Sequence, residues 1–84
     1  MRSKELIKKA AILEPCVRIG KNKITESAVN EVKKMLKKNK LIKVKLLKAA
    51  LENSDKKTLA KELAGKTGAT IIQQVGFVVV LYKD

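Results

Sequence analysis

The chain has 84 residues, of which 45% are hydrophobic, so we expect one small domain with a single core over residues 1–84. Its formal net charge is +12, because 20 Lys and Arg residues outnumber 8 Asp and Glu residues. One Cys and no His exclude an internal disulfide, argue against a zinc site and remove the commonest general base. We therefore predict a protein that is not an enzyme and that uses no metal or other cofactor.

The first elements in chain order are an amphipathic helix and a short strand, separated by Pro15. Ser3 is a good N-cap for a helix from Lys4 to Leu13, along which apolar residues recur at helical spacing. We interpret this basic and apolar start as a helix of a cytoplasmic protein and not as a signal peptide, since no small-residue cleavage site follows. No apolar stretch is long enough to span a bilayer.

A strand with a basic turn and a second helix comes next. Cys16, Val17 and Ile19 indicate a strand, with Arg18 on its opposite side. Gly20 permits a tight turn, and Thr25 is a favourable N-cap for the helix that follows. This helix has an apolar stripe and a lysine-rich surface, the latter formed by Lys33, Lys34, Lys37 and Lys38.

The second strand is predicted over "LIKVKLL". Ile42, Val44 and Leu46 form one side of it, and Lys43 and Lys45 lie on the other. Such alternation is typical of a strand with one buried face, so we expect a basic outer face on the sheet.

The last elements are a third helix and a β-hairpin. Asn53 or Ser54 caps the helix, and Gly68 suits the position just after its end. The stretches 70–75 and 77–83 are strands that can pair around Gly76. The resulting order, α-β-α-β-α-β-β, predicts an α/β fold (α+β, two layers) with a four-stranded mixed sheet.

The distribution of charge indicates a polyanionic partner. Between Val32 and Leu51 the chain has eight lysines and no acidic residue. Folding does not require this, and self-repulsion opposes it. A nucleic acid explains it best, followed by an anionic membrane surface.

The residue types favour contacts with phosphates over contacts with bases. Phe77 and Tyr82 are the only aromatic residues, too few for the stacking platforms of sheet-based RNA binders. The stretch "IGKNKIT" places a glycine and two lysines between a strand and a helix start, a favourable corner for anions. By contrast, "AKELAGKT" lacks the first glycine of a P-loop and lies in a helical pattern, so we expect no nucleotide or other small-molecule substrate there.

Taken together, "VRIGKNKITESAVNEV", "LIKVKLL" and "GKTGATIIQQVGFVVVLYK" resemble the CRM domain, the chloroplast RNA splicing and ribosome maturation domain, in its stand-alone YhbY-like form. The resemblance covers nearly the whole chain. It implies a fold similar to the C-terminal domain of bacterial translation initiation factor three, RNA binding, and association with precursors of the large ribosomal subunit. The GxxG loop of that family falls on Gly20–Lys23 here, and the second glycine is replaced by Lys23.

These considerations predict an RNA-binding protein that acts on structured ribosomal RNA. The expected RNA-contacting residues are Gly20, Lys21, Asn22 and Lys23 in the loop, extended by Arg18, Lys43 and Lys45 along the sheet or by Lys33, Lys34, Lys37 and Lys38 along the second helix. Two alternatives remain at this point: an Alba-like chromatin protein that packs duplex DNA, and a basic adaptor that docks on acidic protein surfaces.

Overall fold

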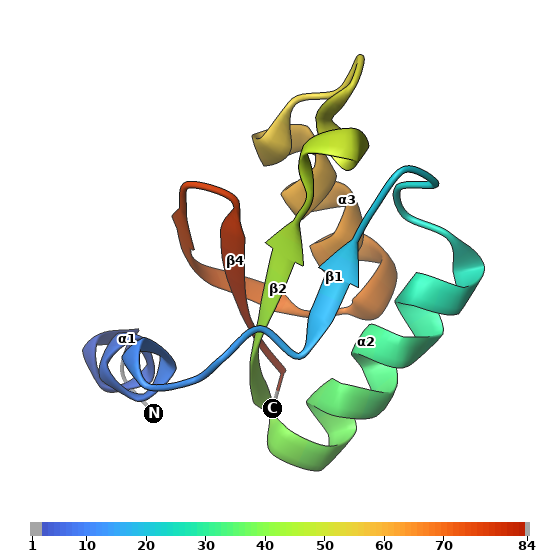
Figure 1. Ribbon diagram of the computed structural model, residues 1–84. Helices are drawn as coiled ribbons and strands as arrows, with labels where there is room; N and C mark the ends of the chain where they lie inside the picture. Colours follow the sequence, from blue (N-terminus) through green and yellow to red (C-terminus); the bar gives the residue numbers. More distant parts are fainter. Residues whose placement is uncertain (1–2, 84) are drawn as a thin grey trace.

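The computed structural model describes residues 3–83, with the side chains of residues 4–83. The elements, in order, are α1 (Ser3–Ala11), β1 (Val17–Ile19), α2 (Glu26–Asn39), β2 (Leu41–Leu46), a 3-10 helix η1 (Lys48–Leu51), α3 (Lys56–Thr67), β3 (Thr70–Val75) and β4 (Val78–Tyr82) (Figure 1). The predicted order is confirmed, and η1 is the one element that the sequence reading missed. The proposed capping by the Ser3 side chain lies outside the described residues.

The four strands form one mixed sheet in the order β1-β2-β4-β3. β1 pairs in parallel with β2, and α2 connects them. β4 pairs antiparallel with both β2 and β3. The predicted parallel crossover and the terminal hairpin are thus both confirmed. Because β4 inserts between β2 and β3, the hairpin turns back toward the centre of the sheet and leaves β3 at the edge.

The main core lies between the sheet and the pair of helices α2 and α3 (Figure 1). The strands contribute every second residue, for example Ile42, Val44 and Leu46 of β2, as their alternation predicted. The helices contribute their apolar stripes, including Val32 and Leu36 from α2 and Leu59, Ala60, Leu63 and Ala64 from α3.

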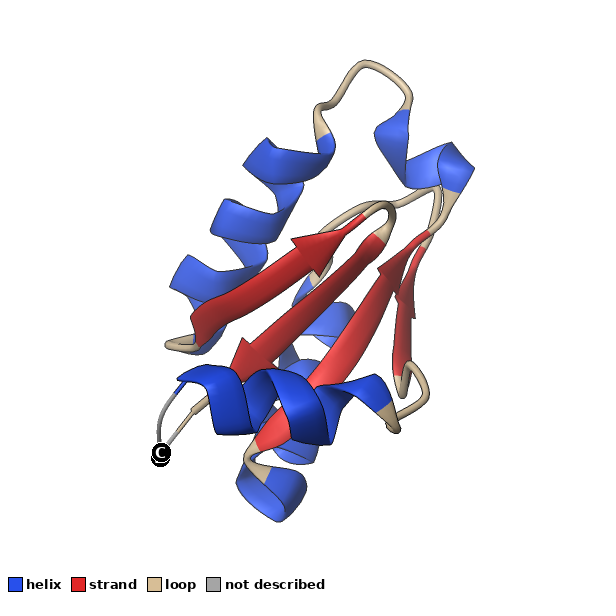
Figure 2. Ribbon diagram, turned by 90° about the vertical axis from the view of Figure 1, so that its left-hand side faces the viewer, coloured by secondary structure: helices blue, strands red, loops and turns tan. Residues whose placement is uncertain are grey.

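α1 packs on the opposite face of the sheet (Figure 2). Its Leu6 and Ala10 form a second, smaller core with Leu41 and Val80. The two-layer expectation did not include this contact. It matters for function because α1 crosses only one end of that face and leaves the rest of the sheet uncovered.

The helix termini confirm two predicted caps and correct one. The Ala28 backbone N–H donates to Thr25 Oγ1 at 3.0 Å, so Thr25 caps α2. Gly68 ends α3 with the left-handed φ of 71° that favours glycine. The prediction of Asn53 or Ser54 as the cap of α3 is wrong, because Asp55 occupies that position and the Ser54 hydroxyl accepts a hydrogen bond from elsewhere.

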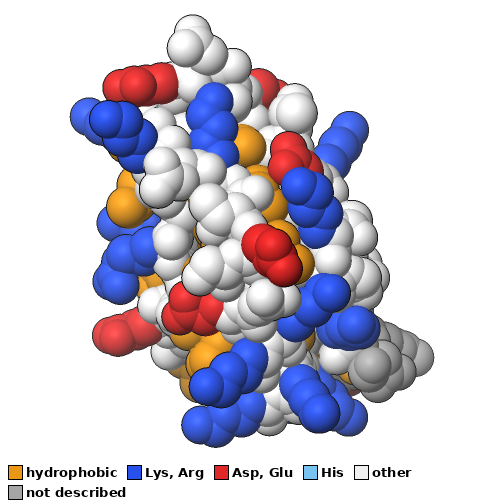
Figure 3. All heavy atoms as spheres, turned by 90° about the vertical axis from the view of Figure 1, so that its right-hand side faces the viewer, with side chains coloured by type: hydrophobic (Ala, Val, Ile, Leu, Met, Phe, Trp, Pro, Cys, Tyr) orange, Lys and Arg blue, Asp and Glu red, His pale blue; other side chains and the backbone are white. Residues whose placement is uncertain are grey.

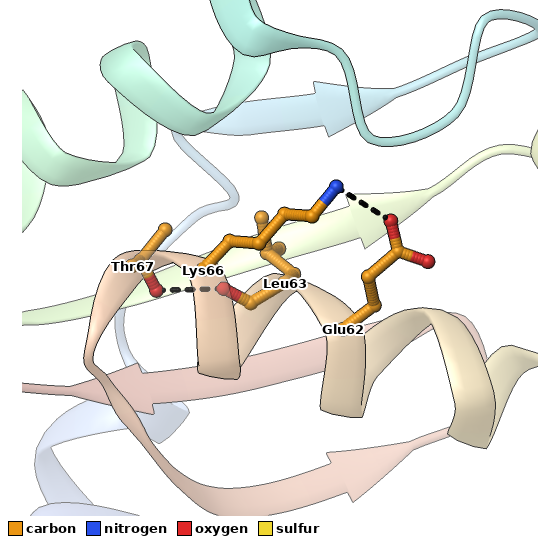
Figure 4. Close-up of polar contacts among 4 residues, drawn as sticks. All are labelled: Glu62, Leu63, Lys66 and Thr67. Carbon is orange, nitrogen blue, oxygen red and sulfur yellow. Dashed lines mark hydrogen bonds and ion pairs between the residues drawn. The ribbon is translucent and has the colours of Figure 1, made fainter.

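The P-loop-like stretch lies inside α3, as its helical pattern predicted (Figure 4). The Thr67 hydroxyl is buried and donates to the Leu63 carbonyl at 2.8 Å. Lys66 forms an ion pair with Glu62 at 3.1 Å. The two side chains that a P-loop would direct at phosphate and metal therefore have other partners.

Candidate nucleic-acid interface

The loop between β1 and α2 begins with a tight turn over Gly20–Lys23. The Lys23 N–H donates to the Gly20 carbonyl at 2.9 Å, and the Thr25 N–H donates to the Lys23 carbonyl at 3.0 Å. The Leu47 N–H donates to the Ile19 carbonyl at 2.9 Å, which fixes the start of the loop beside the end of β2. The loop therefore leaves the sheet at a defined point and leads directly into the capped start of α2.

The unusual backbone conformation in this turn belongs to Lys23. Its φ is 57°, in the left-handed region that non-glycine residues rarely adopt, whereas Gly20 has no positive φ. A Cβ on Gly20 would meet only Leu47 Cδ1 at 3.7 Å, an ordinary contact. The tight turn that Gly20 was predicted to permit is present, but its one positive φ belongs to Lys23. The second glycine of the GxxG loop implied by the resemblance falls on Lys23, the position whose positive φ favours glycine.

Lys23 holds its position through two hydrogen bonds to the segment that precedes α3. Its Nζ donates to the Glu52 carbonyl at 2.8 Å and to Ser54 Oγ at 2.6 Å. We call this pair of contacts the Lys23 bridge. Charged donors form stronger hydrogen bonds than neutral ones, which offsets the strain of the left-handed backbone.

Lys21 and Asn22 differ from Lys23. Both are exposed, and neither side chain makes a hydrogen bond or ion pair with the described residues. The loop thus has one lysine engaged in its own fold and one lysine open to a ligand.

The uncovered face of the sheet forms a basic surface that continues from this loop. Arg18 and Lys45 are neighbours in the β1–β2 register, and Lys43 lies two residues before Lys45 on β2. Arg18 and Lys45 are exposed, and Lys43 is half-buried. No Asp or Glu occurs in any of the four strands. We call Arg18, Lys43 and Lys45 the basic sheet surface.

The lysines of α2 lie on the other side of the molecule. Lys33, Lys34, Lys37 and Lys38 are all exposed on the helix that covers the opposite face of the sheet. Figure 3 views this side and shows Lys and Arg side chains over it, several of them gathered at its lower end, with the acidic side chains above that end. The two extensions proposed from sequence therefore do not form one continuous surface.

Two further lysines join the α2 group. Lys40 and Lys83, with Lys33 and Lys37, surround a hollow of about 380 Å³ beside Leu36. The sequence reading missed them because they are far apart in the chain. They meet because Lys83 follows β4, and its N–H donates to the Lys40 carbonyl at 2.9 Å.

Cys16 and the metal-binding residue types give no sign of a reactive centre. Partial burial raises the pKa of the Cys16 thiol above its ordinary value, so it carries less thiolate than a free cysteine at neutral pH. Its Sγ lies 3.7 Å from the Lys43 carbonyl, to which it donates weakly.

Among residues 3–83 no three His, Cys, Asp or Glu side chains are grouped so as to hold a metal ion. No helix in this range is long and apolar enough to cross a membrane.

Comparison with known families shows to which family the chain belongs. The model of the CRS1/YhbY (CRM) domain matches residues 2–83. The chain belongs to this family. The resemblance inferred from its motifs is thereby confirmed.

Three similar proteins carry names that refer to RNA binding. A probable RNA-binding protein of Methanocaldococcus jannaschii is 43% identical over 75 residues, which cover 89% of this chain and 55% of that protein. One from Pseudomonas aeruginosa is 31% identical over 71 residues, covering 84% and 66%. One from Bacillus subtilis is 30% identical over 76 residues, covering 90% and 77%. This CRM chain thus spans between about half and two thirds of the first two relatives.

A solved structure supports the fold. The solution structure of a hypothetical Staphylococcus aureus protein, itself considered a candidate RNA-binding protein, superposes with a TM-score of 0.81 at 29% identity. The match covers 98% of this chain and 83% of that one. The α+β architecture with a four-stranded mixed sheet is thus that of a CRM-like protein.

Substitutions of Lys23 test how much the Lys23 bridge contributes to the free energy of unfolding. Lys23→Ala removes both hydrogen bonds and keeps an unfavourable left-handed residue, so we expect it to lower the free energy of unfolding by about 1–2 kcal/mol. Lys23→Gly also removes the bonds but tolerates the positive φ, so it should lose about 1 kcal/mol less than the alanine variant. Urea denaturation measures both. Lys21→Ala, two residues away and exposed, is the control and should stay within about 0.5 kcal/mol of the unchanged protein. Equal losses for the two Lys23 variants would contradict the strain at this residue.

Proposed function

We propose that this protein binds structured RNA through the Gly20–Lys23 loop and the basic sheet surface, and that its target is the ribosomal RNA of the large subunit during assembly in the cytoplasm. The observation that carries the proposal is the group of unpaired cationic side chains on strands that contain no Asp or Glu, beside an exposed loop. Membership of the CRM family and the names of the relatives support RNA as the ligand.

The loop and the basic sheet surface fit together better than the loop and the α2 lysines. Arg18 is two residues from Gly20 and lies next to Lys45 in the register. Along α2, Lys37 lies eleven residues after Glu26, which corresponds to about 17 Å at the usual helical rise of 1.5 Å. We therefore expect an RNA backbone that contacts the loop to continue over Arg18 and Lys45. Lys33, Lys34, Lys37 and Lys38 remain available to a second segment of a large RNA.

Within the loop we assign different roles to its residues. Lys21 and Asn22 offer exposed donors for phosphate oxygens, and Gly20 allows a close backbone approach. Lys23 orients the loop through the Lys23 bridge, so its charge adds less to RNA binding than that of Lys21.

The short final hairpin favours this function over an Alba-like one. Only Gly76 and Phe77 separate β3 from β4, which have six and five residues. Alba-like chromatin proteins are expected to have a long hairpin arm, and this hairpin is too short to form one.

The salt dependence of binding tests the proposed surface. Lys21→Ala and Lys45→Ala should each reduce the slope of log affinity against log salt by about 0.7 on single-stranded RNA, because each loses one phosphate contact. Lys23→Ala should change the slope much less. Lys61→Ala makes the same charge change on the exposed side of α3 and serves as the control. Reduced slopes for Lys34→Ala and Lys38→Ala with none for Lys45→Ala would move the interface to α2.

The choice of polymer tests the function itself. In a competition at one fixed salt concentration, we expect structured RNA to displace a labelled RNA probe from the protein at a lower concentration than duplex DNA of equal length does. Equal or tighter binding of DNA would favour the chromatin alternative. An absence of binding to either polymer would favour an adaptor that docks on acidic proteins.

Crosslinking in cells tests the proposed ribosomal target. Ultraviolet crosslinking of the tagged protein, followed by sequencing of the attached RNA, should enrich large-subunit ribosomal RNA or its precursor over messenger RNA. The Lys21→Ala/Lys45→Ala double variant is the control and should lose that enrichment at equal expression. Enrichment of unrelated transcripts would leave RNA binding intact and refute the ribosomal role.

A further inference from the structure

The uncovered part of the sheet contains a hollow of about 280 Å³ that is lined by Lys43, Gln73, Val75, Val78 and Val80. It lies among β2, β4 and β3, beside the end of the sheet that α1 covers. Three of the five lining residues are valines, and Val75 is 63% exposed. The hollow is thus an apolar surface bordered by one cationic and one amide side chain.

A β-bulge in β3 brings the side-chain amide of Gln73 into this hollow. Ile71 pairs with Leu81, and Gln73, not Ile72, pairs with the next residue of β4, Val80. The extra residue places two successive side chains on the same face. Ile72 packs against the core beneath α1, and Gln73 lines the hollow. Bulges re-aim side chains in this way next to binding sites.

The Gln73 amide has no partner among the described residues. The neighbouring Gln74 provides a contrast, because its Nε2 donates to the Lys56 carbonyl at 3.1 Å. Gln74 thus stabilises the fold through its hydrogen bond, whereas Gln73 presents a donor and an acceptor side by side above a valine surface. That is the arrangement that recognises a planar group with a complementary edge.

We propose that this hollow binds one unpaired adenine of the RNA. This inference rests on the proposed function. A hollow of this size is just below the range of about 300–1,000 Å³ typical of small-molecule sites, which suits one base better than a nucleotide cofactor. The valines cover one face of the base, as apolar side chains do around unstacked bases. Lys43, with Arg18 and Lys45 nearby in the register, neutralises the flanking phosphates.

The amide determines the choice of base. A glutamine amide pairs with adenine through its carbonyl to N6–H and its NH₂ to N7. Guanine presents two acceptors, N7 and O6, at the same edge, and O6 would face the glutamine carbonyl. Pyrimidines lack N7 and fill less of the valine surface. Recognition of splayed bases at their edges is the usual route to sequence preference in RNA binding.

The test compares three ten-nucleotide RNAs: oligo(U), oligo(U) with one central A, and oligo(U) with one central G. We expect the unchanged protein to bind the A-containing RNA roughly tenfold more tightly than oligo(U), the gain from one bidentate pair. Gln73→Ala and the similarly sized Gln73→Leu should both bring this ratio close to one. β3 is an edge strand, so both variants should fold, which circular dichroism and urea denaturation verify. Asn30→Ala removes an exposed amide from α2 and should keep the tenfold ratio.

Three other outcomes would overturn the inference in distinguishable ways. A ratio that survives both Gln73 variants would remove the hollow as the site and leave the proposed function standing. An equal gain from G would refute recognition by the amide. Binding to none of the RNAs, including the structured RNA of the competition experiment, would refute the proposed function and this inference together.

Discussion

The whole molecule depends on β2, because its side chains point alternately to the two faces of the sheet. The residues on one face are apolar, and those on the other include two lysines. β2 pairs with β1 on one side and with β4 on the other, so its register fixes both. Ile42, Val44 and Leu46 support the core under α2 and α3, and Lys43 and Lys45 project from the other face. A slip by one residue would bury the lysines and expose the core residues, so the packing of the core determines where the charges are displayed.

The high charge is compatible with folding because the cations are divided between opposite sides of the sheet. Cations on separate faces are further apart than cations on one face, and salt screens much of the remaining repulsion. Among residues 3–83, the only ion pair joins Lys66 and Glu62, so the fold does not neutralise its lysines internally. Lys23 differs from the other lysines, because its ammonium group donates hydrogen bonds to two neutral acceptors within the fold.

Local patterns were sufficient to predict the elements, their order and the class of the sheet. The alternation in β2, the Thr25 cap and the Gly68 terminus each depend on residues within one or two turns of chain. What the sequence could not provide were contacts between distant segments. The docking of α1 on the second face, the grouping of Lys83 with Lys40, and the Lys23 bridge all join residues at least 29 positions apart. The site was therefore predicted as a set of basic residues, but its division into two surfaces, and the structural role of Lys23, required the three-dimensional arrangement.

Besides reorienting Gln73, the bulge in β3 affects how this edge of the sheet can pair with another strand. β3 lies at the edge of the sheet, where unpaired N–H and C=O groups can add a strand from another molecule and start aggregation. A bulge interrupts the regular spacing of those groups and increases the local twist, so a second flat strand cannot pair along the full edge. The opposite edge is β1, which has only three residues and offers little length for pairing. The small sheet is thus protected at both margins from self-association while its broad face stays open.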